Sequence, residues 1–300
     1  MVKAKVLTYE RIYYSLWEAA QRYGKFTQFR VIGKSHDERM IPMLEIGRGQ
    51  ECVFCIAGVK GTDRKMPLQL FQMAEEYCQT YEAGWKLEDF YDVRKLLDTV
   101  RLCFIPLLNP DGYEICGKGY TAVRNPVYRQ MLRMKNIPSA EFACNARGIE
   151  ISKNFPTAYY TRKRIHQEPA SENETKALIR IIQEYKSKGL LSFCQSQKRI
   201  INYKQQSFSY NQKSHRLARH LQNRTKYRLE KHTWEPEEDR RQEKSTGSLE
   251  QYYGELTKQP ALMIQQPVSF TSEDDQKEGR EEEYKEIHIL PLEYLFSLME

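Results

Sequence analysis

The chain has 300 residues, of which 40% are hydrophobic, 12% aromatic and 29% charged. This composition is that of a globular protein large enough to bury a substantial core, and it excludes disordered and collagen-like chains. The formal net charge of +7 bears on solubility and on acidic partners rather than on fold. The longest apolar runs, such as 102–108, are too short to span a bilayer, so no membrane partner is expected.

The amino-terminal segment and the cysteines indicate a cytoplasmic protein. Glu10 and Arg11 interrupt the segment where a signal peptide would be continuously apolar. The seven cysteines are an odd number and mostly lie in apolar runs, which is typical of reduced, buried thiols. Cys52 and Cys55 form a C-x-x-C pattern, but they lie in an apparent buried strand and no second pair matches them. We therefore expect neither a metal nor a redox site there.

Helical and strand-like patterns alternate along the first two thirds of the chain. In order, they predict a helix over 9–23 with Thr8 as its N-cap, strands over 28–32, 41–46 and 52–57, a helix over 68–80 and a strand over 100–108. Ser171 and Glu174 form a capping-box pattern for a helix that Gly189 closes, and a strand is predicted over 190–194. Such alternation predicts an α/β fold with a mixed central sheet and helices on both faces.

The last third is more polar. Residues 198–231 are rich in Lys and Arg with interleaved aromatic residues, and residues 273–285 are almost wholly charged. We interpret these as solvated helix faces and a charged loop. Interleaved basic and aromatic residues also occur in binders of single-stranded nucleic acid, which is an alternative function. Acidic stretches on both sides would cancel much of the field, so a nucleic-acid partner is not favoured.

Five segments, in order, resemble one known family. They are KVLTYERIYYSLWEAAQRY with FRVIGKSHDERMIPMLEIGRG, then CVFCIAGVKGTDRKMPLQLFQMAEEYC, YDVRKLLDTVRLCFIPLLNPDGYEI, NARGIEISKNFP and PVSFTSE. Together they resemble the zinc carboxypeptidases, and most closely the bacterial γ-D-glutamyl-L-diamino acid endopeptidases, which cut peptidoglycan stem peptides. The resemblance covers about residues 5–298 and implies a single domain with the zinc-carboxypeptidase-like fold.

The resemblance also implies where a zinc ion would be held. The family uses His and Glu of an H-x-x-E motif and a later His, with water in the open position. Here the first motif is Lys60-Gly61-Thr62-Asp63, and the later position falls on Gln195, or on Cys194 if the register slips by one. Lys offers a zinc ion no lone pair when protonated. We therefore expect no metal ligands at these degenerate positions and no cofactor, although the family cofactor is zinc.

Other family roles fall on matching positions. Glu273 stands at the general acid/base position, Arg147 at the family arginine of the NARG motif, and Lys153 in the polar pair that follows it. Gln242 stands where the family has a mobile tyrosine. The alternatives are an accidental match of Glu273 in an acidic loop and a structural ion pair for Arg147.

These residues favour a catalytically inactive pseudo-peptidase that binds a peptide or protein. A metal supplies both the activated water and the electrophile, and losing it costs about 10⁴-fold or more in rate. The runner-up hypothesis is an active metallopeptidase with a rebuilt site containing Asp63 and Cys194. On either hypothesis, we expect Lys60, Asp63, Arg147, Gln195 and Glu273 to meet at the carboxyl edge of the sheet.

Overall fold

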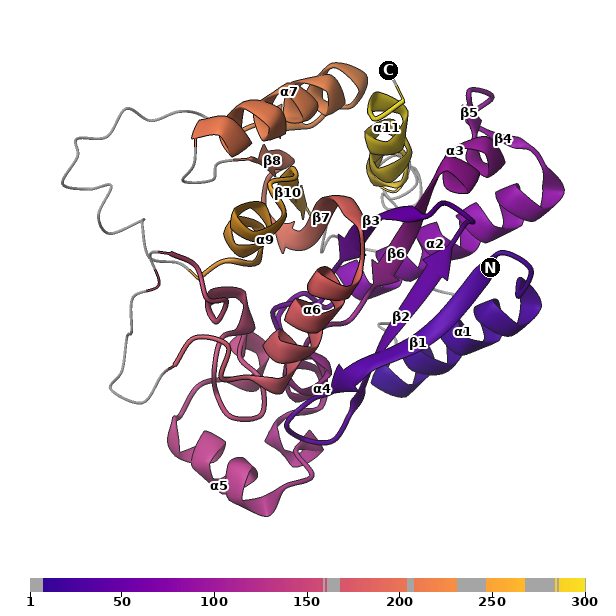
Figure 1. Cartoon of the computed structure of the whole chain (residues 1–300). Coiled ribbons are helices and arrows are strands. Elements are labelled where there is room, and N and C mark those ends of the chain that lie inside the picture. Colours follow the sequence, from indigo (N-terminus) through magenta and orange to yellow (C-terminus); the bar gives the residue numbers. More distant parts are fainter. Residues whose placement is uncertain are drawn as a thin grey trace.

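An eight-stranded mixed β-sheet runs through the centre of the computed structural model (Figure 1), with strand order β1-β2-β6-β3-β7-β10-β8-β9. The structure describes residues 8–158, 160, 168–203, 208–230, 247–267, 284 and 286–299. The strands of this sheet are β1 (Thr27–Lys34), β2 (Met40–Ile46), β3 (Glu51–Ile56), β6 (Val100–Ile105), β7 (Ser187–Ser196), β8 (Ile200–Asn202), β9 (Arg228–Leu229) and β10 (Ala261–Pro267). A separate hairpin joins β4 (Lys86–Leu87) to β5 (Tyr91–Asp92).

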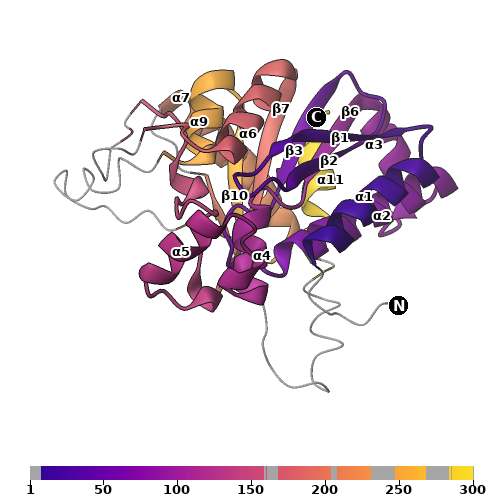
Figure 2. The same ribbon diagram turned by 90° about the horizontal axis from the view of Figure 1, so that it is seen from below.

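Helices cover both faces of the sheet. They are α1 (Tyr9–Arg22), α2 (Met66–Ala83), α3 (Val93–Thr99), α4 (Pro110–Lys118), α5 (Pro126–Met134), α6 (Asn173–Glu184), α7 (Phe208–Arg224), α9 (Leu249–Thr257) and α11 (Leu290–Ser297). Buried residues of α1, α2, α3, α7 and α11 form one hydrophobic cluster with the sheet, whereas α6 and α9 contribute to a second cluster. In Figure 2, α6 and α9 accordingly lie across the sheet from α1, α2 and α11.

The strands predicted over 52–57, 100–108 and 190–194 are neighbours in the middle of the sheet. β3 pairs in parallel with β6 on one side and with β7 on the other. Five of the six residues of β3 are buried, as expected for a strand covered on both faces. Because side chains alternate along a strand, Cys52 joins the cluster of α6 and α9 while Cys55 joins the opposite one. The C-x-x-C pattern therefore places its two thiols on opposite faces of the sheet.

The predicted helix starts are correct at α1 and wrong at α6. The Thr8 hydroxyl accepts a hydrogen bond from the backbone N–H of Arg11 and caps α1, as predicted. At α6 the N-cap residue is Glu172 rather than Ser171, and the Glu172 side chain makes no capping bond. The Ser171 hydroxyl, predicted to cap the helix, donates a hydrogen bond to the Glu172 carboxylate instead. None of the described helices is both long and apolar enough to cross a membrane.

Candidate functional site

The turn after β3 holds the first two predicted site residues. Lys60 is half-buried and Asp63 is buried, three residues further along the same turn. Between them, Gly61 lies against neighbouring backbone, and a Cβ added there would come within 2.4 Å of the carbonyl oxygen of Phe142 and 2.6 Å of that of Gly112. The backbone N–H of Gly61 also donates to the carbonyl of Ala143 at 3.0 Å. A residue without a side chain is therefore needed for this turn to pack against Gly112 and the segment that precedes the NARG turn.

Asp63 joins this turn to the end of β7. Its Oδ1 accepts a hydrogen bond from the backbone N–H of Gln195 at 3.0 Å, and its Oδ2 accepts a longer one from that of Lys60 at 3.4 Å. Burial raises the pKa of Asp63 to about 6, although these bonds and the charge of Lys60 act in the opposite direction. Both carboxylate oxygens thus serve backbone donors, which ties Lys60, Asp63 and Gln195 together as the sequence predicted.

The two candidates for the third ligand position differ in chemistry. Gln195 has a buried Oε1 with no hydrogen-bond partner among the described residues. Burial, together with the charge of Asp63, raises the pKa of the Cys194 thiol to about 12. Zinc binds the thiolate rather than the thiol, so a neutral Cys194 is a poor ligand near neutral pH.

The NARG turn presents Arg147 at its surface. The Asn145 Oδ1 accepts hydrogen bonds from the backbone N–H groups of Arg147 and Ile149, both at 3.1 Å, which fixes the turn. The guanidinium of Arg147 pairs with the buried Glu172 at 3.2 Å, and its side chain remains 40% exposed. This ion pair was the structural alternative to a ligand-binding role, yet the exposed part of the guanidinium can still meet a ligand.

Lys153 is held by Glu150, a residue that Lys60 also influences. Its ammonium pairs with the Glu150 carboxylate at 2.7 Å. Burial would raise the pKa of Glu150, but bonds from Lys153 and Ser152 and the charge of Lys60 lower it. The field of Lys60 therefore acts on Asp63 as well as on Glu150. The remaining predicted residues, Glu273 and Gln242, lie outside the described residues.

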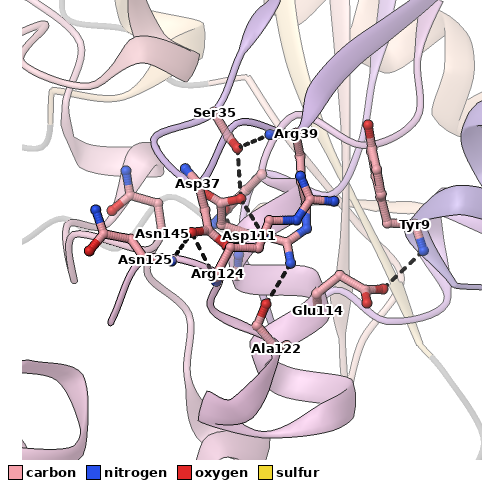
Figure 3. Close-up of polar contacts among 12 residues, drawn as sticks. Tyr9, Ser35, Asp37, Arg39, Asp111, Glu114, Ala122, Arg124, Asn125 and Asn145 are labelled. Atoms are coloured by element: carbon pink, nitrogen blue, oxygen red, sulfur yellow. Dashed lines mark hydrogen bonds and ion pairs between the residues drawn. The ribbon is translucent and has the colours of Figure 1, made fainter. Parts of the chain in front are cut away.

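A buried polar network lies under the loop that joins β1 to β2 (Figure 3), and the sequence analysis missed it. The Arg39 guanidinium donates to Asp37 at 2.7 Å, to Asp111 at 2.9 Å and to the carbonyl of Ala122 at 2.7 Å. The Ser35 hydroxyl donates to the Asp111 carboxylate at 2.7 Å. The signal in the sequence was the run of six polar residues K-S-H-D-E-R, but the partners of Ser35 and Arg39 on α4 lie far along the chain.

His36 belongs to a second cluster that the sequence analysis missed. Its Nε2 lies 3.2 Å from an oxygen of Glu172, and ligand atoms of His36, Glu172 and Glu174 all lie within 4.8 Å of one another. Both glutamates are fully buried at the start of α6. The Asn145 amide donates to Glu172 at 2.7 Å and to Glu174 at 3.3 Å. An imidazole and two carboxylates at this spacing can hold a metal ion.

Comparison with known proteins places the chain among peptidases. The family model for zinc carboxypeptidase matches residues 12–277. Bovine thrombin-activatable fibrinolysis inhibitor, solved with tick carboxypeptidase inhibitor, has a TM-score of 0.70 at 14% identity, with 98% of each chain covered. Carboxypeptidase A from Helicoverpa armigera scores 0.68 at 15% identity, over 99% of this chain and 75% of that one. A metallo-carboxypeptidase from Burkholderia cenocepacia scores 0.64 at 13% identity, over 98% and 69%. No curated protein sequence matches.

The expectation that the chain has no metal cofactor is wrong. The matching family is zinc-dependent, and the described residues include the His36, Glu172 and Glu174 group. At Lys60, Asp63 and Gln195, however, the residues do not fit zinc, because an ammonium, a carboxylate bonded to backbone and an amide offer no adequate ligand set. The family model covers most of the sequence and the solved relatives share the fold. This chain therefore belongs to the zinc carboxypeptidase family.

Proposed function

We propose that this chain is a catalytically inactive member of its family that binds peptides through their carboxylate groups. The observation that carries the proposal is the chemistry of the turn after β3, where an ammonium stands in place of a ligand imidazole. Lys60 repels a divalent ion placed beside it, and it attracts the anionic groups of a peptide. The surface that takes up a carboxylate would then consist of Lys60, Arg147 and Lys153.

The partners of these cations support the proposal. Arg147 and Lys153 are each paired with one carboxylate, but both side chains remain 40% exposed. Among the described residues, no carboxylate forms an ion pair with the Lys60 ammonium. A guanidinium held in place by Glu172 loses little side-chain entropy when a carboxylate binds to its exposed edge.

The contacts of Asp63 and Cys194 argue against a rebuilt catalytic site. The two oxygens of Asp63 already accept backbone hydrogen bonds, which hold the carboxylate in the turn, and Asp63 supplies only one of the ligands that zinc needs. Burial favours the neutral thiol of Cys194. Asp63 and Cys194 thus offer less than the three protein ligands that a catalytic zinc site needs.

The first prediction concerns hydrolysis. The unmodified protein should not cleave carboxypeptidase substrates or peptidoglycan stem peptides, even with added ZnCl₂, since no activated water is held beside the scissile bond. Loss of such a centre removes about 10⁴-fold or more in rate. The assay is product release followed by chromatography, with and without zinc. Zinc-dependent cleavage by the unmodified chain would overturn catalytic inactivity and favour the rebuilt site.

The second prediction concerns binding. A short peptide ending in glutamate should bind more tightly than the same peptide with its terminal carboxylate amidated, as measured by isothermal titration calorimetry. Arg147→Ala should weaken binding of the acid by about 10-fold, the loss of one charge-assisted contact. Lys86→Ala removes an exposed cation in β4 and should change nothing. Equal affinity for acid and amide, or an unchanged Arg147→Ala, would contradict the assignment of the carboxylate site.

The nucleic-acid alternative receives less support. Binders of single strands stack bases on exposed aromatic rings, but Tyr203 is 6% exposed and Tyr227 is 2% exposed. Much of the basic segment forms α7, whose Leu217, Ala218 and Leu221 belong to the hydrophobic core. The basic residues of α7 therefore fit the predicted solvated helix face. A steep salt dependence of RNA affinity would be needed to revive this alternative.

A further inference from the structure

The start of α6 concentrates negative charge where water has no access. Asp111, Glu172 and Glu174 are fully buried and Asp37 is 2% exposed, while Arg39 is the one buried guanidinium in contact with the two aspartates. Arg147, on Glu172, is partly exposed. Four carboxylates and two guanidiniums leave an excess of two negative charges, with His36 counted as neutral. Buried charge of this kind needs a compensating cation or proton.

Glu174 is where compensation is weakest. Among the described residues its carboxylate has no cationic partner, and the Asn145 amide reaches it only at 3.3 and 3.5 Å. The nearby charges of Asp111 and Glu172 are both negative. The charge of the buried Glu174 carboxylate is therefore compensated only in part by the described residues around it.

The contacts of His36 point in the same direction. Its Nε2 lies 3.3 Å from the backbone N–H of Asn173, a donor, and 3.2 Å from a Glu172 oxygen, an acceptor. One ring nitrogen carries either a proton or a lone pair, so it cannot satisfy both neighbours. A cation between the imidazole and the carboxylates would use the lone pair and screen the glutamates from each other. A zinc ion with bonds of about 2.1 Å holds neighbouring ligand atoms about 3.4 Å apart, close to the 3.2 Å between His36 Nε2 and the Glu172 oxygen.

We propose that His36, Glu172 and Glu174 form a binding site for a divalent transition-metal ion, distinct from the Lys60, Asp63 and Gln195 positions. One imidazole nitrogen and two carboxylate oxygens suit Zn²⁺ or Mn²⁺ better than Mg²⁺, which prefers an all-oxygen octahedral shell. Asn145 contacts both glutamates and fixes the NARG turn, while Glu172 also holds Arg147. The metal would therefore stabilise the turn that presents Arg147, a structural role rather than a catalytic one.

The test is zinc titration of the whole protein after removal of metal with EDTA and dialysis. The unmodified chain should bind about one zinc, read by calorimetry, and its thermal unfolding should shift upward with zinc but not with magnesium. Glu174→Gln and His36→Asn should each weaken zinc binding by more than about 10-fold. Asp63→Asn, at the family position, should leave zinc affinity unchanged.

Each other outcome counts against the proposal. If the unmodified chain binds no zinc, the cluster is an internally paired polar group only. If Asp63→Asn abolishes binding while Glu174→Gln retains it, the metal lies at the family position. Because a misfolded His36→Asn variant would also lose zinc binding, far-ultraviolet circular dichroism of each variant is compared with that of the unmodified protein. Glu174→Gln keeps the side-chain shape, so a folded Glu174→Gln with full zinc affinity overturns the site by itself.

Discussion

Glu172 and Glu174 stand two residues apart, yet their surroundings drive their pKa values in opposite directions. Burial raises the pKa of Glu174 to about 8, and the charge of Asp111 adds to this. Burial also opposes ionisation of Glu172, but hydrogen bonds from His36, Ser171 and Asn145 outweigh it and lower its pKa to about 2. Without a bound cation, the pair therefore carries one negative charge near neutral pH rather than two: Glu172 is ionised and Glu174 is protonated.

This difference predicts how stability depends on pH. Between the ordinary pKa of 4.5 and the raised value of about 8, folded Glu174 holds a proton that the unfolded chain releases. Its stabilising contribution is thus complete below pH 4.5 and is lost as pH rises through about 8. Glu174→Gln should remove a slope of up to about 1.4 kcal/mol per pH unit from the free energy of unfolding. Urea unfolding with EDTA between about pH 5 and pH 8 measures it.

The matched control for this prediction is Glu184→Gln, at the other end of the same helix. The Glu184 side chain is 47% exposed, so Glu184→Gln should alter the slope of stability against pH little. If the free energy of unfolding varies with pH in the same way for Glu174→Gln and the unmodified protein, Glu174 ionises normally. The conclusion that folded Glu174 keeps its proton near neutral pH is then wrong.

At the residue scale, what the sequence could predict depends on distance along the chain. Lys60 and Asp63 occupy one motif, and Gln195 follows a recognisable strand, so family resemblance located all three. The structure brings them together as predicted. His36 could not be assigned in this way, because its partners Glu172 and Glu174 lie in a distant helix and nothing in the short K-S-H-D-E-R turn identifies them. Long-range side-chain pairing is decided by tertiary packing.

At the scale of elements, the passage from α6 to β7 shows why boundaries were harder than element types. The sequence predicted that Gly189 closes the helix, but α6 ends at Glu184 and β7 begins at Ser187. Gly189 is instead a buried strand residue that pairs with Val53. A Cβ at this position would lie 1.7 Å from the Tyr294 hydroxyl oxygen. The glycine therefore allows a close approach of α11, a reason that no local pattern can reveal.

Gly189→Ala should consequently destabilise the protein. The new methyl group also meets ring atoms of Tyr294 at 2.2 and 2.8 Å, and Tyr294 is fully buried, so strand or helix must shift. Overpacking of this kind costs about 1–3 kcal/mol, which urea unfolding can measure. Tyr294→Phe is the comparison, because it removes only the hydroxyl that donates to the carbonyl of Lys188 at 3.0 Å. An alanine variant as stable as the unmodified chain would show that this contact can relax freely.

At the scale of the whole molecule, one sheet separates two hydrophobic clusters. The predicted mixed sheet with helices on both faces is correct, because alternation of helices and strands is a strong pattern over long segments. The strand order and the way α11 returns to the sheet were not contained in that pattern. They depend on contacts such as that between Tyr294 and Lys188, which join residues far apart in the chain.

The two faces should unfold together, as expected if residues 5–298 act as a single domain. Leu190 and Leu191 are adjacent in β7 and both fully buried, but Leu190 belongs to the cluster with α6 and α9 while Leu191 belongs to the opposite cluster. Replacing either with alanine removes packing from one face only, at a cost of about 2–5 kcal/mol. Because both faces share the strands of the sheet, each variant should lower the midpoint of one common transition. Unfolding curves measured by circular dichroism and by tryptophan fluorescence should therefore coincide. Two transitions, of which Leu190→Ala shifts one and Leu191→Ala the other, would instead mean that the clusters are separate folding units.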